Sequence, residues 1–150
     1  MGKCTGRPPP WLLATVLAAA ALAGACGGGG PRRVSVSLRE WSVQASPAET
    51  KAGRVRFQVE NAGTRPHEMV VVKSDLPPDL LPVSEFRVTE SMVNVAGEVE
   101  AFGAGESRVL ELDLSPGKYL LICNLLERPP DAQPVSHYQN GMVAAFLVTP

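Results

Sequence analysis

Hydrophobic and polar residues alternate along much of the chain after residue 33, which is the period-two pattern of half-buried β-strands. Such alternation covers 34–38, 54–60 and 110–114, while 67–73, 118–123 and 142–148 are more continuously apolar. Gly, Pro, Ser and Asn clusters separate these segments and predict turns. About seven strands joined by turns favour an all-β protein, an antiparallel sandwich with Greek-key connections.

The pattern weakens between residues 74 and 100. Three prolines, Pro77, Pro78 and Pro82, predict a loop there. We expect residues 83–93, which follow that loop, to form a short helix between strands.

The amino terminus has the order of a secretory signal. Lys3 and Arg7 precede an uncharged, Leu- and Ala-rich stretch over 11–25, which is shorter than the roughly 20 residues of a membrane-spanning helix. Residues 22–26, Leu-Ala-Gly-Ala-Cys, resemble the lipobox of bacterial lipoproteins, in which Cys26 is acylated and becomes the first mature residue. The alternative is an ordinary signal cleaved near Ala25, with Cys26 left free.

These features divide the chain into three parts. We expect a lipoprotein signal peptide at 1–25, a Gly-rich tether with acylated Cys26 at 26–32, and a folded domain at 33–150. The protein would then be exported and anchored by lipid to the outer face of the bacterial cytoplasmic membrane, at the cell surface or the periplasmic side.

Composition narrows the function. A chain of 150 residues suits one domain. Removal of Lys3 and Arg7 with the signal leaves 12 basic against 15 acidic residues. Because the basic residues are scattered, nothing indicates nucleic-acid binding.

Loss of Cys4 with the signal also leaves Cys123 as the only thiol besides the proposed anchor. A lone thiol in an oxidising compartment is explained if it binds a metal.

Four side chains at expected strand ends or in loops can provide a metal site. They are His67, Cys123, His137 and Met142. One Cys, two His and a weak axial Met form the ligand set of a blue-copper site. Taken singly, each has a plain structural interpretation as a surface histidine, a buried small hydrophobe or a core methionine. A zinc site is also conceivable, although zinc seldom binds a thioether.

The same residues carry a resemblance to a known family. The segment 61–67, Asn-Ala-Gly-Thr-Arg-Pro-His, resembles the first-ligand segment of plastocyanin-like cupredoxins, the type 1 blue copper proteins. The segments 117–123 and 137–142 resemble their carboxy-terminal ligand region, and the pattern is most similar to that of bacterial exported sulfocyanin-like cupredoxin lipoproteins. The resemblance implies a copper-binding sandwich with His67, Cys123, His137 and Met142 as ligands.

Two features depart from the family pattern. Thirteen residues, 124–136, separate Cys123 from His137, where many relatives have only a few. Glu68 stands where plastocyanins usually carry Asn. An oxygen ligand from Glu68 or Glu127 would produce a less blue, more open site, so this alternative remains beside the four-ligand prediction.

The sequence therefore predicts a membrane-tethered one-electron carrier with one copper ion per chain, and no enzyme activity or small-molecule substrate. We expect a monomer that meets redox partner proteins by weak, transient docking. His137 would be the exposed edge for electron transfer, with Tyr138 and Leu125 or Leu126 in the docking patch. The alternatives are extracytoplasmic copper sequestration or delivery, and a structural or adhesive sandwich with an empty site.

Overall fold

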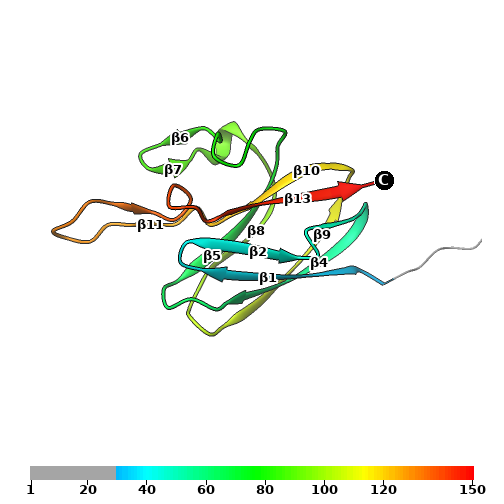
Figure 1. Ribbon diagram of the computed structural model, residues 1–150, viewed down its shortest axis with the longest axis horizontal. Coiled ribbons are helices and arrows are strands. Elements are labelled where there is room, and N and C mark those ends of the chain that lie inside the picture. The colour runs from blue at the N-terminus through cyan, green and yellow to red at the C-terminus, as the bar shows by residue number, and fades with distance from the viewer. Residues whose placement is uncertain (1–29) are drawn as a thin grey trace, which may run out of the picture.

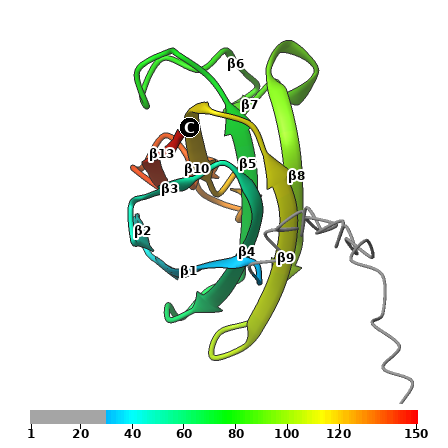
Figure 2. The same cartoon turned by 90° about the vertical axis from the view of Figure 1, so that its right-hand side faces the viewer.

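The computed structural model describes residues 30–150, which form two packed β-sheets (Figure 1). The first sheet has the order β2-β1-β4-β9 and consists of β1 (Arg32–Arg39), β2 (Ser42–Ser46), β4 (Gly53–Asn61) and β9 (Ser107–Leu114). The second has the order β3-β13-β10-β5-β8 and consists of β3 (Glu49–Lys51), β5 (His67–Lys73), β8 (Asn94–Phe102), β10 (Gly117–Ile122) and β13 (Val143–Thr149). In Figure 2, β8 and β9, the last strands of their sheets, lie beside each other.

Most strand pairs are antiparallel, as the sequence predicts, but β1 with β4 and β3 with β13 are parallel. The parallel pairs arise because the chain leaves β2 for the second sheet at Pro47. Proline has no N–H to continue the ladder of the first sheet. β3 then adds to the edge of the second sheet beside β13.

The alternating positions form the core between the sheets. Val55, Phe57 and Val59 of β4 have no exposed surface, and Phe57 packs edge-to-face on Phe146 of β13 at 5.5 Å between ring centroids. The second sheet is also covered on its outer side, where Val70, Val72 and other apolar residues form a smaller cluster. This double coverage explains why 69–72 and 119–123 are continuously apolar.

The segment 83–93 differs from the predicted short helix. It forms a hairpin, β6 (Val83–Ser84) with β7 (Arg87–Val88), followed by a single 3-10 turn, η1 (Glu90–Met92). The Asn124 side chain pairs with the backbone of Val88, accepting from its N–H at 2.7 Å and donating to its carbonyl at 3.0 Å. That pairing holds Val88 extended, so a tertiary contact determines the local structure in place of the expected helix.

A second buried amide anchors the loop that leads to His67. Asn61 at the end of β4 donates to the carbonyls of Arg65 and Phe102, at 2.8 and 3.0 Å, and accepts from the N–H of Gly63 at 3.1 Å. The residue is completely buried. These bonds fix the course of the chain between β4 and β5, and therefore the position at which β5 begins.

The predicted signal peptide at 1–25, Cys26 and the first glycines of the tether lie outside the described residues. Within 30–150, β1 begins at Arg32, one residue before the predicted domain start. No helix in that range is both long and apolar enough to cross a membrane.

Replacing Asn61 by Ala should destabilise the domain, because the change leaves buried carbonyl and N–H groups without partners. We expect the free energy of unfolding to fall by about 1–3 kcal/mol, measured by urea denaturation. Asn94→Ala, at an exposed position in β8, is the matched control and should lie within about 0.5 kcal/mol of the unchanged protein. Equal stability of the two variants would contradict the anchoring role of Asn61.

Candidate metal centre

The four predicted ligands lie at the ends of four strands that meet at one end of the sandwich. His67 is the first residue of β5, Cys123 directly follows β10, and Met142 directly precedes β13. His137 directly follows β12 (Val135–Ser136), which pairs with β11 (Leu126–Glu127). All four side chains are completely buried.

Backbone hydrogen bonds connect the carboxy-terminal ligand positions directly. The Cys123 N–H donates to the Met142 carbonyl at 3.0 Å, and the Met142 N–H donates to the His137 carbonyl at 3.1 Å. The His137 N–H donates to the Leu125 carbonyl at 2.9 Å. The spacing of these side chains is therefore set by main-chain structure, which resists distortion better than side-chain rotamers do.

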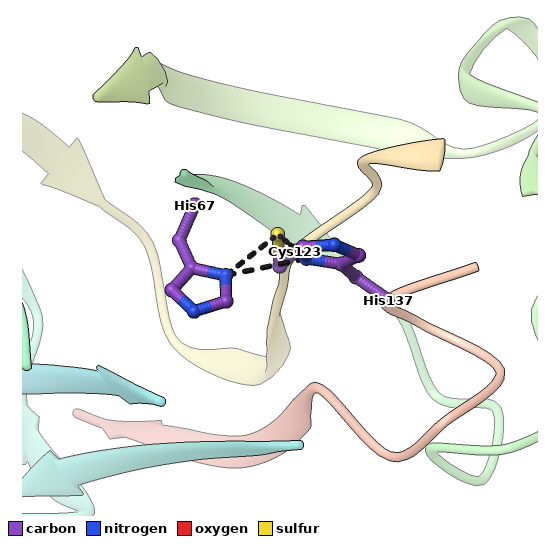
Figure 3. Close-up of side chains that lie close together, drawn as sticks. All are labelled: His67, Cys123 and His137. Carbon is purple, nitrogen blue, oxygen red and sulfur yellow. Dashed lines mark hydrogen bonds between the residues drawn. The ribbon is translucent and has the colours of Figure 1, made fainter. Parts of the chain in front are cut away.

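Figure 3 shows His67, Cys123 and His137 converging on one point. The Cys123 Sγ lies 3.3 Å from His137 Nδ1 and 3.9 Å from His67 Nδ1, and the two Nδ1 atoms are 3.2 Å apart. All three atoms lie within 4.8 Å of one another. Met142 is in the same buried core cluster as Cys123, and its thioether as a fourth ligand stays a prediction.

Burial favours the uncharged forms of Cys123 and His67. Burial raises the pKa of the Cys123 thiol to about 11, although N–H groups, including that of Glu68 at 3.5 Å from the sulfur, act in the opposite direction. Burial also lowers the pKa of His67, and the neighbouring His137 lowers it further. A bound cation reverses this balance, because a coordinating thiol loses its proton.

The donor atoms fit a soft transition metal. One sulfur and two imidazole nitrogens, buried and directed at one another, suit copper or zinc, and the predicted fourth ligand, Met142, would complete the donor set of a type 1 copper site. Hard cations such as Mg²⁺ and Ca²⁺ prefer oxygen ligands. Within residues 30–150, neither Glu68 nor Glu127 joins the group of mutually close donor atoms.

The outer nitrogens of the two histidines face acidic residues. His137 Nε2 is hydrogen-bonded to Glu127 Oε1 at 3.0 Å. His67 Nε2 lies 3.5 Å from Glu40 Oε1 without forming a hydrogen bond. Glu40 instead accepts from the N–H groups of Thr64 and Arg65, at 2.8 and 2.7 Å.

The predicted exposure of His137 is wrong. Its ring is covered by Trp41, whose ring meets it edge-on at 5.3 Å between centroids, and by Glu127. Tyr138 is also buried, with its hydroxyl donating to the Pro78 carbonyl at 2.6 Å, and Leu125 and Leu126 are only half-exposed. The sequence did not indicate that Trp41 and Glu40 lie beside the histidines, because the turn between β1 and β2 carries no ligand motif.

The long segment between Cys123 and His137 has a defined structure. Leu126 pairs with Ser136 and Glu127 with Val135, so the chain folds into a hairpin whose tip contains Pro129, Pro130 and Pro134. The hairpin extends away from the sandwich at the left of Figure 1. Its extra length therefore leaves the strand-end positions of Cys123 and His137 intact.

No protein-family model matches the chain. No curated protein matches it either.

Solved structures do resemble it. Auracyanin from the photosynthetic bacterium Roseiflexus castenholzii, in a dithionite-reduced crystal structure, is 20% identical over 81% of this chain and 100% of its own, with a TM-score of 0.54. Auracyanin A, a "blue" copper protein from Chloroflexus aurantiacus, is 19% identical over 80% of this chain and all of its own, with a TM-score of 0.52. Rusticyanin from Thiobacillus ferrooxidans is 14% identical over 81% and 79% of the two chains, with a TM-score of 0.50.

These similarities show that the chain has the two-sheet fold of the cupredoxins. At this identity they concern the fold, whereas the donor set comes from this chain's own residues. The sandwich architecture predicted from the sequence is thus confirmed.

Copper loading should release protons from the metal-free protein. At pH 7 the Cys123 thiol holds its proton because its pKa is about 11, so formation of the thiolate should release about one proton per copper. Adding copper to lightly buffered protein in the presence of a pH indicator measures the number of protons released. The Cys123→Ser variant should lose most of this proton release. If the variant released as many protons as the unchanged protein, thiolate ligation would be contradicted.

Proposed function

We propose that the protein is a one-electron carrier that holds a single copper ion through His67, Cys123, His137 and Met142. The observation that carries this proposal is the buried convergence of one thiol and two imidazole Nδ1 atoms on a cupredoxin fold. The printed description of auracyanin A as a "blue" copper protein supports it. We also propose, from the ligand motifs alone, kinship with the exported sulfocyanin-like cupredoxins.

When bound, copper supplies a couple between Cu(I) and Cu(II). The chain's own contribution is a rigid set of ligands, since the backbone bonds among Cys123, His137 and Met142 hold their spacing. Burial of every proposed ligand also leaves no open position for a substrate, so we infer electron transfer without substrate turnover. The same burial opposes copper delivery, which requires ligands that a recipient can reach.

Electrons should pass between the site and the surface through Trp41. Its ring meets that of His137, and its side chain is partly exposed. Arg65 and Glu127 lie beside it as a mixed-charge rim, with side-chain exposures of 43% and 34%. We propose that redox partners dock weakly on this end of the sandwich, in place of the predicted patch around Tyr138.

The membrane tether is a separate proposal that rests on the amino-terminal sequence. We propose that the signal at 1–25 is removed and that Cys26 carries lipid, which would hold the domain at the outer face of the cytoplasmic membrane. Mass spectrometry of the exported protein should find a chain that starts at Cys26 with the added mass of acyl groups. An unmodified Cys26 in a protein released from cells would contradict the anchor.

The redox proposal is tested by voltammetry of the copper-loaded protein. We expect one reversible wave of one electron, and we expect His137→Ala to abolish it because the variant removes an imidazole ligand from the site. Gln139→Ala changes an exposed residue in the same loop and should keep the wave. A reversible wave of unchanged potential in His137→Ala would overturn the ligand assignment.

A further inference from the structure

The outer nitrogen of His137 is connected to the surface by a chain of charged and aromatic groups. Glu127 Oε1 contacts Nε2 at 3.0 Å, and Glu127 Oε2 pairs with Arg65 Nη1 at 2.6 Å. The Arg65 guanidinium in turn lies over the Trp41 ring, 5.7 Å from its centroid. The Trp41 ring also contacts the His137 ring edge-on. Contacts therefore connect these four side chains in a closed cycle: His137, Glu127, Arg65 and Trp41.

The β11–β12 hairpin is the structural reason for this arrangement. Glu127 is paired with Val135, and Ser136 alone separates Val135 from His137. The His137 N–H also donates to the carbonyl of Leu125, two residues before Glu127. A direct, shorter connection from Cys123 to His137 would contain no strand pair to bring a carboxylate back to the histidine. The long ligand loop therefore has a specific consequence, which is the delivery of Glu127.

A carboxylate at Nε2 determines which nitrogen of His137 carries the proton. The carboxylate can only accept, so Nε2 must donate, and the lone pair of the neutral ring is left on Nδ1. Nδ1 is the atom that lies 3.3 Å from the Cys123 sulfur. An acceptor at the outer nitrogen also increases the donor strength of a metal-bound imidazole.

His67 has no equivalent contact. Its nearest carboxylate oxygen, Glu40 Oε1, is at 3.5 Å and is already accepting from two backbone N–H groups. Glu40 therefore mainly holds the loop before β5. The two imidazoles differ in their outer partners, and His137 alone has the full hydrogen bond to a carboxylate.

We propose that Glu127 is a positioning residue of the metal site, which orients His137 through Nε2 and biases the site toward the more positively charged state of the metal. This inference rests on the proposed copper function. Negative charge close to the metal favours Cu(II) over Cu(I), and Arg65 offsets part of that charge while holding the carboxylate in place. The residue thus tunes the reduction potential without contacting the metal.

Glu127→Gln tests the charge while it keeps the size and an acceptor oxygen. We expect the copper-loaded variant to keep its intense visible band and to shift the reduction equilibrium about tenfold toward Cu(I), which is a rise in potential of about 59 mV for one electron. The matched control is Glu111→Gln, which removes the negative charge from the ion pair between Glu111 and Arg56 on the first sheet. Its potential should stay at that of the unchanged protein, because solvent screens an exposed charge remote from the site.

Glu127→Ala tests the hydrogen bond. In ¹⁵N-labelled protein reduced to diamagnetic Cu(I), we expect the His137 Nε2–H resonance to be visible and protected from exchange in the unchanged protein. The resonance should persist in Glu127→Gln and broaden by exchange in Glu127→Ala.

The two proposals fail in different ways. If the unchanged protein forms no intense visible band with copper, the electron-carrier function itself fails. If the band forms, but both Glu127 variants keep the original potential and Nε2–H exchange, the positioning role is overturned and the copper site stands.

Discussion

Mutual proximity of three buried donor atoms is the constraint on which the rest of this structure depends. The Cys123 sulfur and the Nδ1 atoms of His67 and His137 face one another inside a buried end of the sandwich. Burying such groups is unfavourable unless they are satisfied, and here their partners are mainly one another and the backbone N–H groups of Glu68 and Leu125 at the sulfur. A soft cation held by all three would replace these marginal contacts with strong bonds, and this is the physical basis for assigning the site to a metal.

The surrounding fold serves to hold those atoms in place. Asn61 fixes the loop before His67, while Asn124, next to Cys123, ties the segment after the sulfur to the β7 strand. Both are buried amides that use their side chains to satisfy backbone groups of distant segments. The β11–β12 hairpin likewise holds a side chain in place, since it positions Glu127 at the outer nitrogen of His137. Rigid strands, buried amides and an outer carboxylate thus act together on a small group of ligand atoms, and little side-chain freedom remains for the site to rearrange.

Much of the fold was predictable because alternation survives wherever one face of a strand is covered. The segments 34–38 and 54–60 follow this pattern and are strands, and the continuous apolar run at 70–72 is buried on both faces. The predicted helix at 83–93 was wrong because the bonds from Asn124 to Val88 come from a residue 36 positions away. The three close donor atoms were predictable because few residues of this chain bind soft metals. The cover over His137 was not, since it depends on how the β1–β2 turn and the β11–β12 hairpin pack against the histidine.

The most direct test of the account is the visible and electron paramagnetic resonance spectrum of the protein loaded with one equivalent of Cu(II). The proposed copper site predicts an intense band at about 600 nm and narrow copper hyperfine splitting, as expected for a thiolate and two imidazoles around copper. Only a weak band, with the wide splitting of a site dominated by oxygen and nitrogen ligands, would contradict it.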